Sequence, residues 1–275
     1  MSFSGQTAWI TGASSGIGAA LAKALAKQGA RMVLSGRNVA ALEAVAAECG
    51  EALVLPFETT DITAIAPAVE KAWDWALGGS GGIDMLINNA GISQRSLAVD
   101  TGFAVYERII GVDLLAPIAL TQAILPRMAA RGSGRLVMIS SVAGKVGVPL
   151  RTAYSAAKFG LIGYADALRA ETAHLGIKVH VIAPGSIRTE VSRNALTADG
   201  SRRNASDSAI DNGIAPDLAA AEMIAAITND EREIIIATGA EKAMGELRRT
   251  PDALFDQIAG LMAAGYAEKM KAEGS

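Results

Sequence analysis

The chain is poor in cysteine, aromatic residues and net charge, and each shortage excludes a class of protein. A single cysteine, Cys49, in 275 residues cannot form an internal disulfide, which excludes a disulfide-stapled scaffold. The formal net charge of −3 lacks the basic excess of proteins that bind nucleic-acid phosphates. Aromatic residues make up 4% of a chain that is 51% hydrophobic. This composition favours helices packed on a buried parallel sheet over an all-β fold.

Long apolar runs and clusters of metal ligands are also missing. No stretch has the roughly 18 consecutive apolar residues of a membrane helix, and residues 1–6 lack the basic start and apolar stretch of a signal peptide. His174 and His180 stand without a Cys, Asp or Glu cluster at ligand spacing. We therefore expect a cytoplasmic protein with no metal, no integral membrane segment and no nucleic-acid partner.

Short β-type runs alternate with helical runs along the chain. Strands are predicted over residues 7–11, 31–35, 52–57, 85–88, 135–140, 178–183 and 233–237, and helices over 17–28, 40–48, 64–77, 103–131 and 152–175. This alternation is typical of βαβ units in an α/β protein, and seven strands suit one doubly wound parallel sheet with helices on both faces. We expect residues 1–275 to form a single catalytic domain, without internal repeats or a linker.

Two regions depart from this rhythm. Residues 186–213 are polar and lack a sustained apolar period, which predicts a mobile loop or lid beside the substrate. The tail, residues 241–275, contains an apolar pattern at helical spacing, formed by Leu254, Phe255, Ile258, Leu261, Met262 and Tyr266. This pattern predicts an amphipathic helix that packs on its own core, on a partner subunit or on a lipid surface.

The segment Thr11–Gly18 has the glycine spacing G-x-x-x-G-x-G between a predicted strand and a predicted helix. In that context Gly12 allows a tight turn, Gly16 allows a pyrophosphate to approach the backbone, and Gly18 allows the helix to pack closely on the sheet. The helix that follows would direct its free N–H groups and positive dipole end at the phosphates. The spacing therefore predicts a dinucleotide site.

The end of the second strand indicates which dinucleotide binds. An acidic residue there would bond the ribose 2′-hydroxyl and repel a 2′-phosphate, but the sequence has Gly36 followed by Arg37. The planar guanidinium of Arg37 suits phosphate oxygens. We therefore expect NADP(H) rather than NAD(H) as the cofactor.

Tyr154 and Lys158 form a Y-x-x-x-K pair on a predicted helix, so both side chains lie on one face. The Lys158 ammonium favours the phenolate form of Tyr154, which prepares this side chain to exchange a proton with a substrate oxygen. The pair is common by chance when it stands alone. Its place after the glycine turn, the N-N-A-G segment and Ser141, in that order, gives it weight.

Taken in order, T-G-x-x-x-G-x-G, N-N-A-G (Asn88–Gly91), Ser141, Y-x-x-x-K and P-G-x-x-x-T (Pro184–Thr189) resemble the motifs of the short-chain dehydrogenase/reductase family. The resemblance covers about residues 7–240. It implies a Rossmann-type fold, an oxidoreductase activity that interconverts a ketone and a secondary alcohol, and a homodimer or homotetramer formed through the two long helices.

The resemblance also implies roles for single residues. Ser141 would hold the substrate oxygen, and Lys158 would hold the nicotinamide ribose. The N-N-A-G segment would support the sheet and contact the adenosine side of the cofactor, while Pro184–Thr189 would flank the nicotinamide. Glu58 stands where relatives usually have an aspartate beside the adenine, which puts that contact in question.

One catalytic position departs from the family pattern. The stretch Val112–Ala116 matches V-N-x-x-G, but Asp113 replaces the asparagine of the proton relay. In relatives that asparagine orders a water molecule linked to the lysine. Ionised Asp113 can accept a hydrogen bond from such a water but cannot donate one. We expect activity with an altered pH profile.

Residues 194–202 are similar to a stretch of the family's dehydrogenase/reductase member 7B group, which points to an apolar, bulky carbonyl substrate. A broad carbonyl reductase, a reductase of 3-oxoacyl thioesters, or a cofactor-binding sensor or scaffold with little turnover are the alternatives. The expected catalytic residues are Ser141, Tyr154, Lys158 and Asp113. The expected cofactor-binding residues are Gly12, Ser14, Ser15, Gly16, Ile17, Gly18, Arg37, Asn38, Glu58, Asn89, Ala90, Gly91, Tyr154, Lys158, Pro184, Gly185, Ile187 and Thr189.

Overall fold

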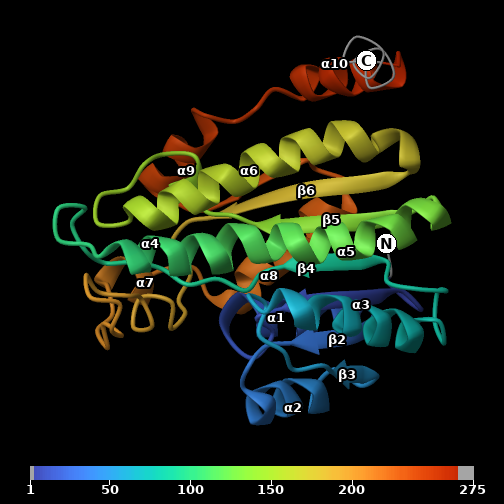
Figure 1. The fold of residues 1–275 in the computed structure, drawn as a ribbon, viewed down its shortest axis with the longest axis horizontal. Helices are drawn as coiled ribbons and strands as arrows, with labels where there is room; N and C mark the ends of the chain where they lie inside the picture. Colours follow the sequence, from blue (N-terminus) through green and yellow to red (C-terminus); the bar gives the residue numbers. More distant parts are fainter. Residues whose placement is uncertain (1–2, 266–275) are drawn as a thin grey trace.

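A computed structural model describes residues 3–265, which fold around a seven-stranded sheet (Figure 1). The strands are β1 (Thr7–Thr11), β2 (Arg31–Ser35), β3 (Ala52–Val54), β4 (Met85–Asn88), β5 (Gly134–Ile139), β6 (Ile177–Pro184) and β7 (Glu233–Ile236). All pairings are parallel, in the order β3-β2-β1-β4-β5-β6-β7. The strand order reverses between β1 and β4, and such a switch point opens a crevice at the carboxyl ends of the strands. The predicted doubly wound α/β fold is confirmed.

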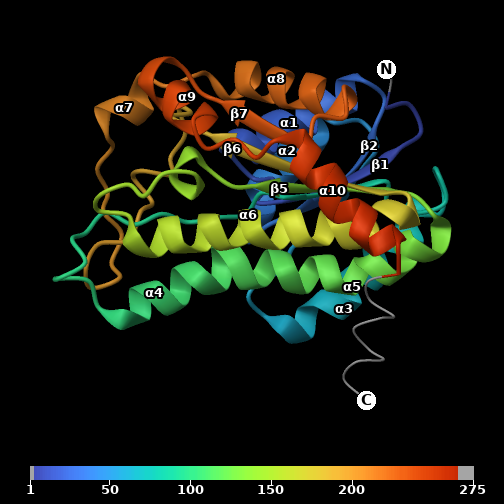
Figure 2. The same ribbon diagram turned by 90° about the horizontal axis from the view of Figure 1, so that it is seen from above.

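Helices cover both faces of the sheet (Figure 2). One layer contains α1 (Gly16–Lys27), α2 (Val39–Ala47) and α8 (Pro216–Thr228), and the other contains α3 (Ile62–Ala76), α5 (Ala116–Arg131) and α6 (Thr152–Thr172). Successive side chains of a strand point to opposite faces, so Ile10 packs into the first layer and Trp9 into the second. Because both faces are buried, the central strands are almost wholly apolar.

Most element boundaries lie close to their predicted positions, with two exceptions. The strand predicted over residues 52–57 ends at Val54, since Pro56 has no N–H to offer a sheet ladder. Helix α8 has no counterpart among the predicted helices. It begins at Pro216, a residue whose missing N–H is harmless in a first helical turn, and it buries Met223 and Ile227 against α1 and the sheet.

The helix predicted over residues 103–131 is continuous but irregular in its middle. Helix α4 (Phe103–Ile110) runs through a π-helical turn (Gly111–Leu115) into α5. Pro117 gives a physical reason, because it has no N–H to donate to the carbonyl of Asp113 and its ring would crowd that carbonyl in a regular helix. The turn carries the Asp113 side chain, which is fully buried.

Within residues 3–265, Phe103–Arg131 is the one helix that is long and apolar enough to cross a membrane. Its most apolar window has a mean hydropathy of 1.8. Its residues Leu120 and Ile124 are buried under the sheet, as in a core helix of a globular protein. A core helix passes the same test of length and composition, so the helix is weak evidence for a membrane span.

The amphipathic tail predicted from Asp252 onward contains α10 (Asp252–Ala263), preceded by α9 (Gly239–Glu246). Phe255 of α10 is buried, with its ring centroid 4.2 Å from the guanidinium carbon of Arg169 on α6. This contact favours packing on the chain's own core. Leu254 is exposed, while Tyr266 and the side chains of Ile258, Leu261 and Met262 lie outside what the structure describes.

Candidate functional site

A cleft of about 710 Å³ opens at the carboxyl ends of the central strands. It is lined by nearly every residue that the sequence nominated, namely Gly12, Ser14, Ser15, Gly16, Ile17, Arg37, Asn38, Glu58, Asn89, Ala90, Gly91, Asp113, Ser141, Tyr154, Lys158, Pro184, Gly185, Ile187 and Thr189. Gly18 does not line the cleft and lies beneath the glycine turn. The cleft therefore brings residues from across the sheet into one concave surface, as ligand sites of this size do.

The glycine turn between β1 and α1 has a backbone that side chains would obstruct. Gly12 and Gly16 have φ angles of +66° and +55°, in the left-handed region that glycine tolerates. A Cβ on Gly12 would lie 2.8 Å from Ala90 Cα, and one on Gly18 would collide with the carbonyl oxygen of Gly12. No acidic residue stands in the first turn of α1, so its unpaired N–H groups and positive dipole end favour an anion.

The N-N-A-G segment after β4 holds this turn in place. Thr11 Oγ1 accepts hydrogen bonds from the backbone N–H groups of Asn89 (3.0 Å) and Ala90 (3.1 Å). In return, the Asn89 side-chain amide donates to the carbonyls of Thr11 (2.9 Å) and Gly12 (3.2 Å). These reciprocal bonds fix the ends of β1 and β4 relative to each other, which explains why both asparagine and threonine are needed there.

Arg37, Asn38 and Glu58 form the rim of the cleft beyond β2 and β3. The Arg37 guanidinium, which is 68% exposed, lies 3.5 Å from a carboxylate oxygen of Glu58. The Asn38 side-chain oxygen accepts from the N–H of Ala41 (3.1 Å) and so caps α2. A Cβ on Gly36 would make ordinary contact, 3.7 Å from Ser14 Oγ. Within the part of the chain that the structure describes, the Arg37 guanidinium therefore has one ionic partner, and solvent screens that pair.

Tyr154 and Lys158 lie one turn apart on α6, and Ser141, two residues after the end of β5, lines the same cleft. Lys158 Nζ lies 5.5 Å from the centroid of the Tyr154 ring and donates to the carbonyl of Ile139 (2.9 Å). Ser141 Oγ donates to the Pro184 carbonyl (3.3 Å) and accepts from the N–H of Ala143 (3.1 Å). The serine hydroxyl and the lysine ammonium are thus held by backbone groups of β5, β6 and the turn after β5.

Asp113 forms a buried ion pair with Lys158. Its Oδ2 lies 3.3 Å from Lys158 Nζ, and its Oδ1 accepts from the N–H of Ile92 (2.8 Å). Burial raises the pKa of the Asp113 carboxyl, against the opposing effects of Lys158 and Ile92. Burial also opposes the charge on Lys158, but the Asp113 carboxylate and Tyr154 outweigh it and raise the pKa of the ammonium. The two side chains are therefore coupled, so a change at Asp113 alters the charge beside Tyr154.

Comparison with known proteins decides which family uses this arrangement. The family model for short chain dehydrogenase matches residues 6–200. The chain belongs to the short-chain dehydrogenase/reductase family. The resemblance predicted from the ordered motifs is thereby confirmed, and this family member is an oxidoreductase that acts on CH–OH or C=O groups of a small molecule with a nicotinamide dinucleotide.

Relatives of this short-chain dehydrogenase/reductase extend over almost its whole length. It is 39% identical over 260 residues to the dehydrogenase/reductase SDR family protein 7-like of Anopheles gambiae, covering 91% of this chain and 81% of the relative. It is 37% identical to the SDR family member 7B of Bos taurus, covering 97% and 83%. Among solved structures, a metagenomic short-chain oxidoreductase in complex with NADP is 32% identical, with a TM-score of 0.69 over 85% of this chain and 97% of that one.

The Pro-Gly segment of this family member depends on a carboxylate that the sequence motifs did not reveal. Glu241 at the start of α9 accepts from the backbone N–H of Ser186 (2.7 Å) and from its hydroxyl (2.8 Å). These two bonds fix the chain directly after Pro184 and Gly185. The only sequence signal for this role is that Glu241 follows the last strand.

Gln94 is a second residue that motif reasoning missed. It is fully buried, and its Oε1 accepts from the N–H of Ala153 (2.9 Å) in the first turn of α6, one residue before Tyr154. Its side-chain amide donates to Ser96 Oγ and Thr101 Oγ1, both at 3.1 Å. Gln94 therefore ties the loop after β4 to the helix that carries Tyr154.

Proposed function

We propose that this chain is an NADP(H)-dependent oxidoreductase that interconverts a ketone and a secondary alcohol, with Tyr154 as proton donor and acceptor. The observation that carries the proposal is that Ser141, Tyr154 and Lys158 line one cleft with the glycine turn. Ile92, Leu196 and Ile210 line the same cleft and would contact an apolar part of the substrate. We treat residues 1–275 as one catalytic unit, in which residues 186–213 border the substrate.

The residues of the cleft fit a nicotinamide dinucleotide, which supplies or accepts the hydride when bound. The glycine turn leaves room that a Cβ would fill, and the α1 N-terminus suits a pyrophosphate. Lys158 Nζ lies 5.5 Å from the centroid of the Tyr154 ring and places a positive charge beside the phenol. The Ser141 hydroxyl, held by backbone groups, would bind the substrate oxygen that exchanges its proton with Tyr154.

Arg37 supports the preference for NADP(H). Among residues 3–265 its exposed guanidinium has Glu58 as its ionic partner, at 3.5 Å, and a 2′-phosphate would be a stronger, bidentate partner. A solved relative bound to NADP is consistent with that choice.

The cofactor preference can be tested at Gly36. An aspartate fits there without backbone strain, and its carboxylate would repel a 2′-phosphate and accept from a ribose hydroxyl. We expect Gly36→Asp to weaken NADPH binding relative to NADH binding by about 10- to 100-fold. The measurement is the pair of dissociation constants by fluorescence titration, with Gly36→Ala as the uncharged control. Tighter binding of NADH than NADPH by the native chain would contradict the proposal.

The catalytic proposal is tested by NADPH oxidation with ketones of rising size and apolarity, with Tyr154→Phe alongside. Removal of the hydroxyl should lower turnover by about 10²- to 10⁴-fold while NADPH still binds, because a general acid contributes about that much. Equal rates for the native chain and Tyr154→Phe would contradict the role of Tyr154. Including 3-oxoacyl thioesters and small aldehydes in the panel separates a thioester reductase and a broad carbonyl reductase from the main proposal.

The Asp113–Lys158 ion pair favours one alternative of another class. The Asp113 carboxylate, 3.3 Å from Lys158, partly cancels the positive charge beside Tyr154. A weakened charge at that place fits a cofactor-binding sensor with little turnover. NADPH binding with no turnover on any carbonyl would support this alternative.

We further propose that the chain is cytoplasmic and forms a homodimer or homotetramer through α5 and α6. Leu115, at the start of this helix pair, is 53% exposed and would be covered in such an assembly. Light scattering after size-exclusion chromatography measures the assembly, and a monomer at micromolar concentration would contradict it. Sedimentation with liposomes tests the lipid-surface alternative.

A further inference from the structure

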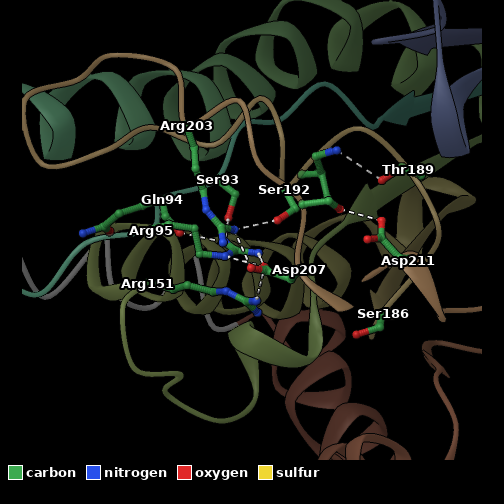
Figure 3. A network of polar contacts seen from close by, with 12 residues as sticks. Ser93, Gln94, Arg95, Arg151, Ser186, Thr189, Ser192, Arg203, Asp207 and Asp211 are labelled. Atoms are coloured by element: carbon green, nitrogen blue, oxygen red, sulfur yellow. Dashed lines mark hydrogen bonds and ion pairs between the residues drawn. The ribbon is translucent and has the colours of Figure 1, made fainter. Parts of the chain in front are cut away.

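Asp207 is the centre of a charged network that the family motifs do not include. Figure 3 shows Arg95, Arg151 and Arg203 converging on its carboxylate. Arg95 Nε and Nη2 both lie 2.7 Å from Asp207 Oδ2, and Arg151 Nη2 lies 3.6 Å from the same oxygen. Arg203 Nη1 donates to Oδ1 and also to Ser192 Oγ (2.9 Å). One carboxylate is thus shared among three guanidinium groups.

The three arginines come from different parts of the fold. Arg95 follows β4, and Arg151 immediately precedes α6, the helix that carries Tyr154. Arg203 belongs to the same segment as Asp207, which precedes α7 (Ser208–Asp211). The network therefore joins the segment after β6 to the loop after β4 and to the start of the catalytic helix.

The network is mostly buried, so its charged groups depend on one another rather than on water for their partners. The Arg95 side chain is 8% exposed and that of Asp207 is 22% exposed. Arg95 is further held by the Ser93 hydroxyl (2.8 Å) and the Gln94 carbonyl (2.7 Å). Without Asp207, the buried Arg95 guanidinium would lose its counter-charge, and an unpaired buried charge lowers the stability of the fold. Burial opposes ionisation of Asp207, but hydrogen bonds from Arg203 and Arg95 outweigh it and hold its pKa far below the usual range.

The segment held by Asp207 forms one wall of the cleft. Leu196 is buried and lines the cleft, and its backbone is paired with the loop after β4: its N–H donates to Ser93 O (2.8 Å) and its carbonyl accepts from Arg95 N–H (2.8 Å). Ile210, three residues after Asp207, lines the same cleft. Asp207 therefore lies between two apolar side chains of the substrate region and fixes the backbone that carries both.

We propose that Asp207 is a positioning residue for substrate selection, which holds residues 192–210 as a pre-formed wall against the start of α6. Under this proposal the wall is fixed before substrate binds, in place of the mobile lid that the polar sequence suggested. The inference rests on the proposed carbonyl reduction for its kinetic readout. Its structural readout is independent of activity.

The test compares Asp207→Asn with Asp199→Asn in the full chain. Asp199 is a matched control, because it lies in the same segment but bonds only within its own turn, to Thr197 Oγ1 (2.6 Å) and Ser201 N–H (2.9 Å). We expect Asp207→Asn to raise KM for the best bulky ketone by about tenfold or more with a smaller change in kcat, since misplacement of a positioning element can cost up to about 10²-fold. NADPH affinity should stay within about twofold, because no cofactor contact is assigned to Asp207. Asp207→Glu, which restores the charge, should recover part of the loss, and Asp199→Asn should match the native chain.

Hydrogen exchange supplies the second readout, measured with NADPH bound. The N–H groups of Leu196 and Arg95 donate to the carbonyls of Ser93 and Leu196, respectively. These two amides should exchange about tenfold faster in Asp207→Asn than in the native chain, whereas the exchange rates of the α1 amides should not change. If Asp207→Asn does not fold, Arg151→Met, which removes the longest of the ionic contacts, should produce the same changes on a smaller scale. Unchanged exchange at Leu196 would overturn the proposal, and so would an equal rise in KM for Asp199→Asn. If no carbonyl is turned over, the proposed function fails while the exchange result still decides the role of Asp207.

Discussion

Two carboxylates organise the two halves of the cleft in opposite ways. Asp113, beside the proposed proton-transfer residue Tyr154, is fully buried and faces the ammonium of Lys158 at 3.3 Å. Asp207, in the proposed substrate wall, is partly exposed and faces three guanidinium groups. Burial dominates at Asp113 and raises its pKa, whereas the hydrogen bonds of the arginines dominate at Asp207 and lower it. The number of cations per carboxylate, set against burial, decides the direction.

This difference matches what each site is proposed to do. A carboxyl group whose charge is only just balanced can change the potential at Tyr154 when its surroundings change. A carboxylate with an excess of cationic partners stays ionised at any physiological pH, so its ion pairs hold the connected segments together throughout that range. The ordinary pKa of an aspartate is about 4. The comparison predicts that Asp113 makes the free energy of unfolding depend on pH above this value, and that Asp207 does so below it.

The largest expected effect comes from removing the one cation at Asp113. Lys158→Met leaves the Asp113 carboxylate buried without its ammonium, which should cost about 3–5 kcal/mol of unfolding free energy at neutral pH. Because burial then raises the pKa of Asp113 without opposition from Lys158, this cost should be absent below about pH 4 and grow as the pH rises. Denaturant unfolding at several pH values measures it. The double variant Lys158→Met with Asp113→Asn should regain most of the loss, and a double variant as unstable as the single would break the comparison.

An intermediate effect is expected at Asp207. Its depressed pKa contributes stability that is present above the unfolded-state value of about 4 and is lost as the pH falls below it. Asp207→Asn should therefore be less stable than the native chain by about 1–3 kcal/mol at pH 6. The difference between the two should shrink as the pH is lowered from about 4. Acid unfolding followed by circular dichroism checks this, and a difference that first emerges above pH 5 would mean that Asp207 is not the titrating group.

The smallest effect on stability is expected for Asp113→Asn, at about 1 kcal/mol, because the amide oxygen can still accept from Ile92 and the Lys158 ammonium keeps its hydrogen bond to the Ile139 carbonyl. Its effect on the pH profile should be clear. Without the carboxylate, the Lys158 charge acts on Tyr154 uncancelled. This change should move the pH profile of alcohol oxidation to lower pH. A profile that does not move, or a variant without any activity, would count against a relay role for Asp113.

The sequence predicted the residues of the proposed cofactor half of the cleft more fully than those of the proposed substrate half. The glycine turn is a local feature, because left-handed φ angles at Gly12 and Gly16 and close packing at Gly18 depend on residues within one β-strand–helix unit. Tyr154 and Lys158 share a helix face by spacing alone. Helix α8 escaped prediction although its Pro216 start is a recognised first-turn signal.

The substrate wall could not be predicted in the same way. Arg95 and Asp207 are separated by 112 residues, and nothing in the local pattern of either marks the other as its partner. The polar composition of residues 186–213 indicated a lid, since the sequence shows charges but not which ones neutralise each other. Gln94 and Glu241 were missed for the same reason, because their partners Ala153 and Ser186 belong to other elements.

The sequence by itself determined the α/β fold, the dinucleotide turn and the Tyr154–Lys158 pair, because each depends on short-range periodicity or on backbone conformations that few residue types adopt. Only the tertiary structure decided that Asp113 pairs directly with Lys158 and that Asp207 joins the wall of the cleft to the catalytic helix. Ion pairs between distant segments have no fixed spacing along the chain. Burial, which sets their strength, exists only after the layers have packed.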